Sequence, residues 1–284
     1  MPMTEREGFG VRLRGAMDTH GPVCVGIDPH PALLTSWHLN DDPAGLERFA
    51  LSVVESLADR VAVLKPQVAF FERHGSQGIA VLERVLKECR ERGVLTIADA
   101  KRGDIGSTMA AYADTWLGDA STLAADAVTV SPYLGFGSLR PALDLARRSG
   151  RGVFVLALTS NPDGASLQHR GGENSVARSI VDKVAVENGN LEHLANIGLV
   201  VGATVGTALL DLGIDLATMG GPILAPGIGA QGATVENLGR TFGAVKTNVL
   251  ASVSREILRS GPDATAMRNV TERTVAELRA VLVD

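Results

Sequence analysis

Eight short apolar runs recur along the chain, and each is followed by glycine, proline or polar residues and then by a stretch with helical periodicity. Runs that are so short and so uniformly apolar are typical of strands buried on both faces, as in parallel sheets covered by helices. We expect strands at residues 23–28, 61–67, 95–101, 127–133, 152–159, 199–204, 222–228 and 245–252.

Amphipathic stretches between these runs predict helices, for example at residues 46–57, 79–91, 109–117 and 234–238. Eight strands that alternate with helices indicate a closed parallel barrel rather than an open sheet with edges. The length of 284 residues agrees, because a (β/α)8 barrel typically needs about 250 residues. Hydrophobic residues make up 45% of the chain and aromatic residues only 4%, so its core must be aliphatic. We predict an α/β protein with the (β/α)8 TIM-barrel fold.

No repeat, linker or low-complexity tract divides the sequence, so residues 1–284 are expected to form a single barrel domain. One long polar, glycine-rich segment, at about 161–174, follows the fifth predicted strand. A loop of this length in a compact domain is either disordered or a lid over a site, and we expect a lid. A helical tail is expected at the C-terminus, after residue 261.

Charged side chains are concentrated where the predicted strands end. Asp28 ends the first strand, Lys65 lies at the end of the second, Asp99 and Lys101 end the third, and Arg255 closely follows the eighth. Barrels of this class carry their chemistry at the C-terminal ends of the strands. Each charge alone could belong to a structural ion pair at the barrel rim. Together at one mouth, they predict a catalytic site.

The alternation of side chains along a strand places these charges more closely. Asp99 and Lys101 share a face, and so do Val61, Val63 and Lys65. If the two valines face the barrel interior, Lys65 lies at the mouth. Lys101 has an acid on either side of it in the sequence, and these acids should favour its ammonium form.

The turn at residues 226–232, "PGIGAQG", contains three glycines, including Gly229, whose backbone amides can approach an anion. An ordinary glycine-rich turn would have the same composition. Barrels of this class often bind phosphate after strands seven and eight, however, and Gln231 and Arg255 lie in that region. We therefore expect a phosphate site there.

Other classes of function find little support. The net charge of −5 argues against a nucleic-acid-binding protein. Two cysteines, Cys24 and Cys89, cannot build a disulfide framework, and neither they nor the six histidines have the spacing of metal ligands. No motif for a nucleophilic serine or cysteine is found. We expect no metal site.

The sequence also predicts a cytoplasmic location. Its N-terminus lacks the charged and then apolar plan of a signal peptide. The uncharged run at residues 194–210, "LANIGLVVGATVGTALL", is at the lower limit for a membrane span and contains polar residues. It is better explained by a buried strand that continues into a helix, so we expect no association with a membrane.

The stretch at residues 97–108, "IADAKRGDIGST", carries a resemblance to a known family. Its Asp-x-Lys-x-x-Asp-Ile-x-x-Thr pattern, at Asp99, Lys101, Asp104, Ile105 and Thr108, resembles the motif of the orotidine 5′-phosphate decarboxylases. The segments "AKRGDIGST" and "LALTSNPDG" are similar to the sequences of the branch of this family found in mycobacteria and related bacteria. The resemblance extends over roughly residues 20–260.

The resemblance implies removal of CO2 from orotidine 5′-phosphate to give UMP, the last step of pyrimidine nucleotide synthesis, with no metal or organic cofactor. Lys101 would be the proton donor and Asp99 would face the substrate carboxylate, while Lys65 and Asp104 would complete the charge array. The remaining substrate contacts implied are Asp28 to the ribose, Ser160 to the pyrimidine, and Gln231 and Arg255 to the phosphate.

The resemblance further implies a homodimer with shared sites, in which Asp104 and Thr108 reach into the neighbour's site. Ile105 is implied as a further substrate-binding residue. Three alternatives stay open. A Schiff-base aldolase also uses a barrel lysine, but its amine must be neutral. A sugar-phosphate decarboxylase that uses Mg²⁺ shares the Asp-x-Lys-x-x-Asp pattern. A barrel that only binds nucleotide would be better served without Asp99 beside the anionic ligand.

Overall fold

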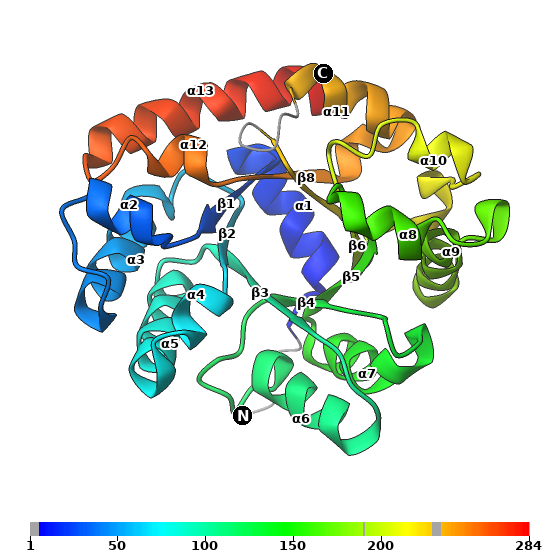
Figure 1. The fold of residues 1–284 in the computed structure, drawn as a ribbon, viewed down its shortest axis with the longest axis horizontal. Coiled ribbons are helices and arrows are strands. Elements are labelled where there is room, and N and C mark those ends of the chain that lie inside the picture. The colour runs from blue at the N-terminus through cyan, green and yellow to red at the C-terminus, as the bar shows by residue number, and fades with distance from the viewer. Residues whose placement is uncertain (1–5, 190, 229–233, 284) are drawn as a thin grey trace.

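The structure, a computed structural model, describes residues 6–189, 191–228 and 234–283. Eight parallel strands close into a barrel in the order in which they occur along the chain, and helices surround it (Figure 1). The predicted (β/α)8 fold is therefore confirmed. The strands are β1 (Val23–Ile27), β2 (Val63–Pro66), β3 (Leu95–Arg102), β4 (Ala127–Val130), β5 (Gly152–Leu158), β6 (Ile197–Val201), β7 (Ile223–Pro226) and β8 (Val249–Val253).

The helices follow the predicted alternation with the strands. They are α1 (Phe9–His20), α2 (Pro31–Ser36), α3 (Pro43–Leu57), α4 (Ala69–Glu72), α5 (Gly75–Glu91), α6 (Gly106–Leu117), α7 (Arg140–Ser149), α8 (Ala165–Gln168), α9 (Val176–Asn188), α10 (Ala208–Asp211), α11 (Val235–Phe242), α12 (Arg255–Leu258) and α13 (Ala264–Leu282). Short 3-10 helices are η1 (Phe136–Leu139), η2 (Pro162–Gly164), η3 (Gly172–Asn174), η4 (Leu216–Met219) and η5 (Gly243–Asn248).

Local capping explains where several helices begin. The Asp42 carboxylate accepts a hydrogen bond from the backbone N–H of Gly45 at the start of α3. Thr234 and Asn237 form a reciprocal capping box before α11. Asp263 caps α13, which lies along the outside of the barrel beside α3, α11 and α12 (Figure 1).

Several predicted strands begin or end elsewhere, and two of them differ for an identifiable reason. The predicted strand at 245–252 was wrong at its start, because residues 245–248 belong to η5 and β8 begins at Val249. The guanidinium of Arg14 on α1 donates to the Thr247 carbonyl and to Asn248, and these contacts hold the turn. The strand predicted at 127–133 ends at Val130, two residues before Pro132, whose nitrogen has no proton to donate.

Two apolar clusters form the core, one between the strands and the outer helices and one inside the barrel. Val63 lies in the inner cluster, as the alternation predicted. Val61 lies in the outer cluster instead, because it precedes β2 and is not part of its alternation. Lys65 is nevertheless two residues after Val63 on the same strand and faces the barrel mouth.

Helix α1 closes the N-terminal end of the barrel (Figure 1). Its side chains Phe9, Leu13 and Met17 join the inner cluster, and the Phe9 ring meets the Phe154 ring edge-on with centroids 5.9 Å apart. A Cβ atom on Gly152 would lie 2.3 Å from the Phe9 ring, so glycine is required for this close packing. The N-terminal half of the barrel interior is therefore filled with apolar side chains. The polar side chains of the interior lie in the other half, at the C-terminal ends of the strands.

The uncharged run at 194–210 forms β6 and then α10, in agreement with the prediction of a strand followed by a helix. Within the described ranges, no helix has the length and apolarity that crossing a membrane requires.

Candidate active site

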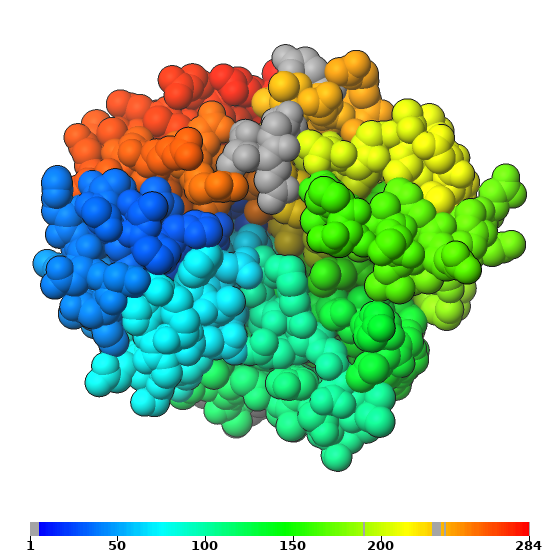
Figure 2. Space-filling view, in the orientation of Figure 1, coloured from blue at the N-terminus to red at the C-terminus, as the bar shows by residue number. Residues whose placement is uncertain are grey.

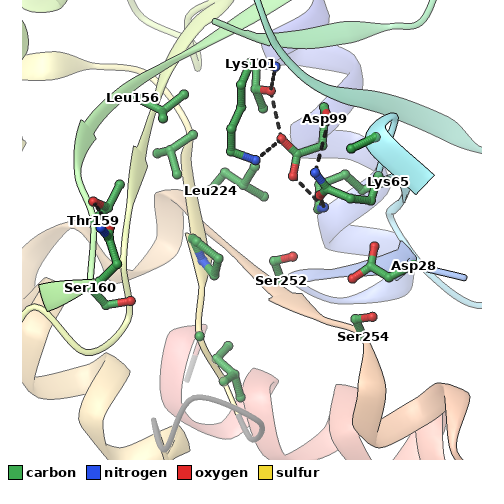
Figure 3. Close-up of a pocket in the computed structure, with 18 of the residues that line it drawn as sticks. Asp28, Lys65, Asp99, Lys101, Leu156, Thr159, Ser160, Leu224, Ser252 and Ser254 are labelled. Carbon is green, nitrogen blue, oxygen red and sulfur yellow. Dashed lines mark hydrogen bonds and ion pairs between the residues drawn. The ribbon is translucent and has the colours of Figure 1, made fainter. Parts of the chain in front are cut away.

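Three charged side chains form a continuous array at the C-terminal end of β2 and β3. Lys65 Nζ lies 2.9 Å from Asp99 Oδ2, and Lys101 Nζ lies 2.6 Å from Asp99 Oδ1. The two lysines approach the carboxylate from different sides (Figure 3). The predicted convergence of Lys65, Asp99 and Lys101 on one point is thus observed.

Burial and charge act in opposite directions on this array. Burial alone would raise the pKa of Asp99, but Lys65 and Lys101 outweigh it and hold the pKa well below its usual range. Burial likewise acts to lower the pKa of Lys65, and the carboxylates of Asp99 and Asp28 raise it above its usual range. Lys65 and Asp99 therefore stay charged at neutral pH.

The end of β3 departs from regular strand geometry at Lys101. Its φ of 47° lies in the left-handed region that residues other than glycine rarely adopt. The pairing of β3 with β4 shifts register between Ala98 and Arg102, which marks a bulge. Strain of this kind gathers at functional sites, where the surrounding structure holds it in place.

Thr129 on β4 contacts the array and was not predicted. Its hydroxyl donates to Asp99 Oδ1 at 2.9 Å and accepts a hydrogen bond from the Lys101 backbone N–H at 3.0 Å. The sequence holds a signal for it, because Thr129 is the one polar residue of the strand Ala127–Val130. Gln67, also not predicted, lies against the array with its amide oxygen 3.4 Å from Lys65 Nζ.

A cavity of about 730 Å³ opens beside the array, and the molecule's surface is hollowed near the centre of this face (Figure 2). Leu156, Val200 and Leu224 form an apolar part of its wall. The side chain of Lys101 is 46% exposed, whereas that of Asp99 is 9% exposed. The Lys101 ammonium can therefore contact a ligand in the cavity, while the Asp99 carboxylate with which it pairs is buried.

Asp28 lies in this cavity, as predicted. Within the described residues, Asp28 Oδ1 is buried without a hydrogen-bond partner, and so is the hydroxyl of Ser254. A Cβ atom on Gly26 would lie 3.0 Å from both Asp28 Oδ1 and Ser254 Cβ, so both side chains lie close to this glycine. Buried polar atoms of native proteins normally have partners, and these two are placed to take one from a ligand.

Ser160 and Arg255 also line the cavity, in agreement with their predicted positions. Ser160 follows β5 and lies across the cavity from Asp28 (Figure 3). Arg255 is the first residue of α12, directly after Ser254. In the part of the chain that the structure describes, its guanidinium has no ion-pair partner. The two other predicted phosphate contacts, Gly229 and Gln231, lie outside the described residues.

The second half of the motif does not line the same cavity. Asp104 accepts a hydrogen bond from the backbone N–H of Ile105, and Ile105 and Thr108 are exposed at the start of α6. The chain turns away from its own barrel mouth after Lys101. These residues are therefore separated from the Lys65–Asp99–Lys101 array of the same chain.

Among the residues described, no three His, Cys, Asp or Glu side chains lie close enough together to bind a metal ion. Both cysteines are buried and free, and burial raises the pKa of the Cys24 and Cys89 thiols to about 12. Neither is a reactive thiolate at neutral pH.

A closed barrel that carries at its mouth a lysine–carboxylate–lysine array, and an arginine with no ion-pair partner among the described residues, defines a barrel enzyme that acts on an anionic ligand. Comparison with known proteins identifies the family. The family model described as "Orotidine 5'-phosphate decarboxylase / HUMPS family" matches residues 21–270. The chain belongs to this family.

Similar proteins cover nearly the whole chain. A curated protein of Streptomyces coelicolor named orotidine 5′-phosphate decarboxylase is 59% identical over 97% of this chain and 99% of its own length. One of Salinispora arenicola with the same name is 54% identical, again over 97% of this chain and 99% of that protein.

Among solved structures, a crystal structure described as a putative orotidine 5′-phosphate decarboxylase from Streptomyces avermitilis has a TM-score of 0.95 and 54% identity. It covers 100% of this chain, which covers 99% of it. An OMP decarboxylase of Leishmania donovani is more distant, with a TM-score of 0.77, 29% identity, and coverage of 98% of this chain and 100% of that one.

Proposed function

We propose that this chain decarboxylates orotidine 5′-phosphate to UMP, and that it does so with its own side chains and no cofactor. The observation that carries the proposal is the Lys65–Asp99–Lys101 array beside the cavity. Membership of the family and the shared name of the curated relatives support the substrate. The reaction makes UMP, so the enzyme would serve pyrimidine nucleotide synthesis.

Lys101 is the proposed proton donor. Cleavage of the bond between C6 and the carboxyl carbon releases CO2 and leaves the electron pair on C6, where the pyrimidine ring stabilises it poorly. A fixed ammonium beside C6 stabilises this charge as it develops and then transfers one proton to it. The exposed position of the Lys101 side chain suits this role. Solvent would return the proton to the neutral amine.

Asp99 is proposed to face the departing carboxylate. Two carboxylates in contact repel each other, and the repulsion disappears as CO2 leaves, so the contact favours the transition state over the bound substrate. Lys65 keeps Asp99 ionised and fixed in place. The apolar wall of Leu156, Val200 and Leu224 would surround the neutral CO2 product.

The remaining cavity residues are proposed to hold the nucleotide. Asp28 and Ser254 have buried oxygen atoms without partners in the described part of the chain, which suits the hydroxyl groups of the ribose. Arg255, with Gln231 and the backbone of Gly229, would bind the phosphate. Ser160 on the opposite wall would contact the pyrimidine. Phosphate binding far from C6 provides energy that holds the reacting carboxylate against Asp99.

Residues 161–174 are proposed to act as a lid. The segment consists of short helical turns joined by loops, and Asn161 and Pro162 line the cavity. The side chain of Gln168 hydrogen-bonds both the backbone and the hydroxyl of Thr159, which ties the segment to the end of β5. Closure over a bound nucleotide would exclude water from the array.

The enzyme is further proposed to be a homodimer with shared sites. Ile105, Tyr133 and Leu134 are 62%, 76% and 53% exposed, and they follow the neighbouring strands β3 and β4 at the mouth end of the barrel. Exposed large apolar side chains at one place favour a partner surface. Asp104 and Thr108 lie in the same region and would enter the partner's site. We expect the dimer to act in the cytoplasm, without nucleic acid or membrane as a partner.

The decisive experiment follows the ultraviolet absorbance of orotidine 5′-phosphate after addition of chelator-treated protein. We expect conversion to UMP at a rate that is unchanged by chelator. Conversion that requires added Mg²⁺, or turnover only of a sugar phosphate, would favour the metal-dependent decarboxylase. Tight binding without conversion would favour a nucleotide-binding barrel.

A further inference from the structure

The bulge in β3 leaves a single residue of β4 opposite the catalytic end of the strand. Ala98 pairs with Val128 and Arg102 pairs with Val130, so residues 99–101 of β3 face Thr129 alone. The extra residues cannot all take part in the regular ladder. Asp99 and Lys101 therefore lie where the backbone pairing of β3 with β4 is interrupted, and other contacts must hold the backbone of these residues in place.

The hydroxyl of Thr129 replaces the missing backbone partner. The N–H of Lys101, whose φ is 47°, donates to Thr129 Oγ1 at 3.0 Å. The same hydroxyl donates its own proton to Asp99 Oδ1 at 2.9 Å. A threonine hydroxyl has one proton and two lone pairs, so both contacts can exist at once. One buried group thus joins the Lys101 backbone to the Asp99 carboxylate.

Thr129 is also the one uncharged donor to this carboxylate among the contacts described. Asp99 Oδ2 accepts from Lys65, and Oδ1 accepts from Lys101 and Thr129. When Lys101 turns to C6, as the proposed function requires, Oδ1 keeps only the bond from Thr129. The carboxylate then stays fixed at the moment when repulsion from the substrate would rotate it away.

We infer that Thr129 is a positioning residue, which holds the Asp99 carboxylate toward the substrate carboxylate and holds the strained Lys101 backbone that aims its ammonium. The inference rests on the proposed decarboxylase function. Removal of the hydroxyl should let Asp99 turn away from the bound substrate, which relieves the unfavourable contact. Turnover should then fall while substrate binding does not weaken.

The test uses Thr129→Val, which replaces the hydroxyl with a methyl group of similar size, and Thr129→Ser, which keeps the hydroxyl. For Thr129→Val, we expect kcat for orotidine 5′-phosphate to fall about tenfold to a hundredfold, with KM unchanged or lower. For Thr129→Ser, we expect kcat to stay within about threefold of the wild type, since the hydrogen bonds are retained.

Thr96→Val is the matched control. Thr96 is a buried threonine of β3, and its hydroxyl also bridges a carboxylate and a backbone N–H, both of Asp126. Thr96 precedes Asp99 by three residues and lies toward the start of β3, away from the cavity. The control should lose stability as Thr129→Val does, yet keep kcat and KM close to the wild-type values.

The outcomes separate this inference from the function it rests on. Failure of the wild type to form UMP would overturn the function itself. With an active wild type, equal kcat in Thr129→Val and the wild type would overturn the role of Thr129, and so would equal losses in the valine and serine variants. If Thr129→Val does not fold, as judged by circular dichroism, Thr129→Ala provides the second hydroxyl-free variant, and a raised KM with unchanged kcat there would also overturn the inference.

Discussion

The Nζ atom of Lys101 lies 2.6 Å from Oδ1 of Asp99, yet the two residues face different surroundings, with side chains 46% and 9% exposed. The pair is thus a buried carboxylate with an accessible cation above it. Breaking an ion pair with a buried member is costly when its charge is left without a partner, but Lys65 still pairs with Asp99 Oδ2 when Lys101 is removed. In this pair, the accessible member is also the group that the proposed chemistry needs.

Lys101→Ala should abolish decarboxylation and leave the fold intact. The substitution removes the proposed proton donor at C6, while Lys65 still neutralises Asp99. We expect kcat to fall at least about a thousandfold, since it loses both proton transfer and charge stabilisation. Single-turnover assays and circular dichroism would test this together. A folded variant that retains more than a few per cent of the wild-type rate would remove Lys101 from the mechanism.

Asp99→Asn should change how stability depends on pH. Burial opposes ionisation of Asp99, but Lys65 and Lys101 outweigh it and hold its folded pKa below the unfolded value of about 3.9. Such a carboxylate stabilises the native state above its unfolded pKa, and this contribution is lost as pH falls toward the folded pKa.

Urea unfolding of the wild type and of Asp99→Asn would therefore differ most near neutral pH, by about 3–5 kcal/mol in the free energy of unfolding if a buried pair is broken. The difference should shrink below about pH 4, where the unfolded chain takes up its proton. A constant difference between pH 7 and pH 3 would contradict an ionised Asp99 in the folded protein.

Arg255→Ala should affect nucleotide far more than nucleoside. In the described residues, the guanidinium has no protein ion pair, so the substitution breaks no salt bridge, and the expected loss is that of a phosphate ligand. We expect kcat/KM for orotidine 5′-phosphate to fall about a hundredfold or more. The phosphate-free nucleoside, already a poor substrate, should change little. Equal losses on the two substrates would place Arg255 elsewhere in the mechanism.

Mixing two inactive variants would test the shared site. Lys101→Ala and Asp104→Ala each break every site of their own homodimers. If Asp104 serves the neighbour, a mixed dimer has one intact site and one doubly broken site. Random exchange makes about half the dimers mixed, so about a quarter of wild-type activity should return. Native mass spectrometry would verify exchange, and exchange without recovery would argue that Asp104 does not act across an interface.

Phe9→Ala should destabilise the barrel without altering its chemistry. The Phe9 ring is fully buried against Phe154 and above Gly152 at the closed end. Loss of a buried phenyl ring costs about 3–5 kcal/mol. Chemical denaturation should show this loss, while kcat below the transition should match the wild type. Normal stability would mean that α1 does not close the barrel.

Much of the fold could be predicted from sequence because strands buried on both faces must be short and apolar, and Val23–Ile27, Gly152–Leu158 and Ile223–Pro226 all meet this condition. Strand ends were harder, as residues 245–248 illustrate. Their 3-10 turn is held by Arg14, more than two hundred residues away in the chain, and no local pattern contains that contact.

Some residues of the candidate site could be predicted from the sequence, and others could be found only in the structure. The resemblance carried by "DAKRGDIGST" correctly predicted the family, and alternation along β3 placed Asp99 and Lys101 together. Thr129 was missed because its role comes from a bulge in the neighbouring strand, which periodicity cannot reveal. Ser254 was missed because its signal is a buried hydroxyl that has no partner among the residues described, and only the structure shows this. The roles of Asp104, Ile105 and Thr108 stay predictions.

By itself, the sequence determined the class of fold, the family and the charged residues of the array, because apolar periodicity and residue types are properties of neighbours along the chain. Only the tertiary structure decided that Lys65 and Lys101 bind different oxygens of the Asp99 carboxylate. It also decided that the Thr129 hydroxyl bonds both this carboxylate and the Lys101 backbone, and that α1 fills the N-terminal end of the barrel. These features depend on contacts between segments distant in sequence, and only closure of the barrel brings such segments within hydrogen-bonding distance.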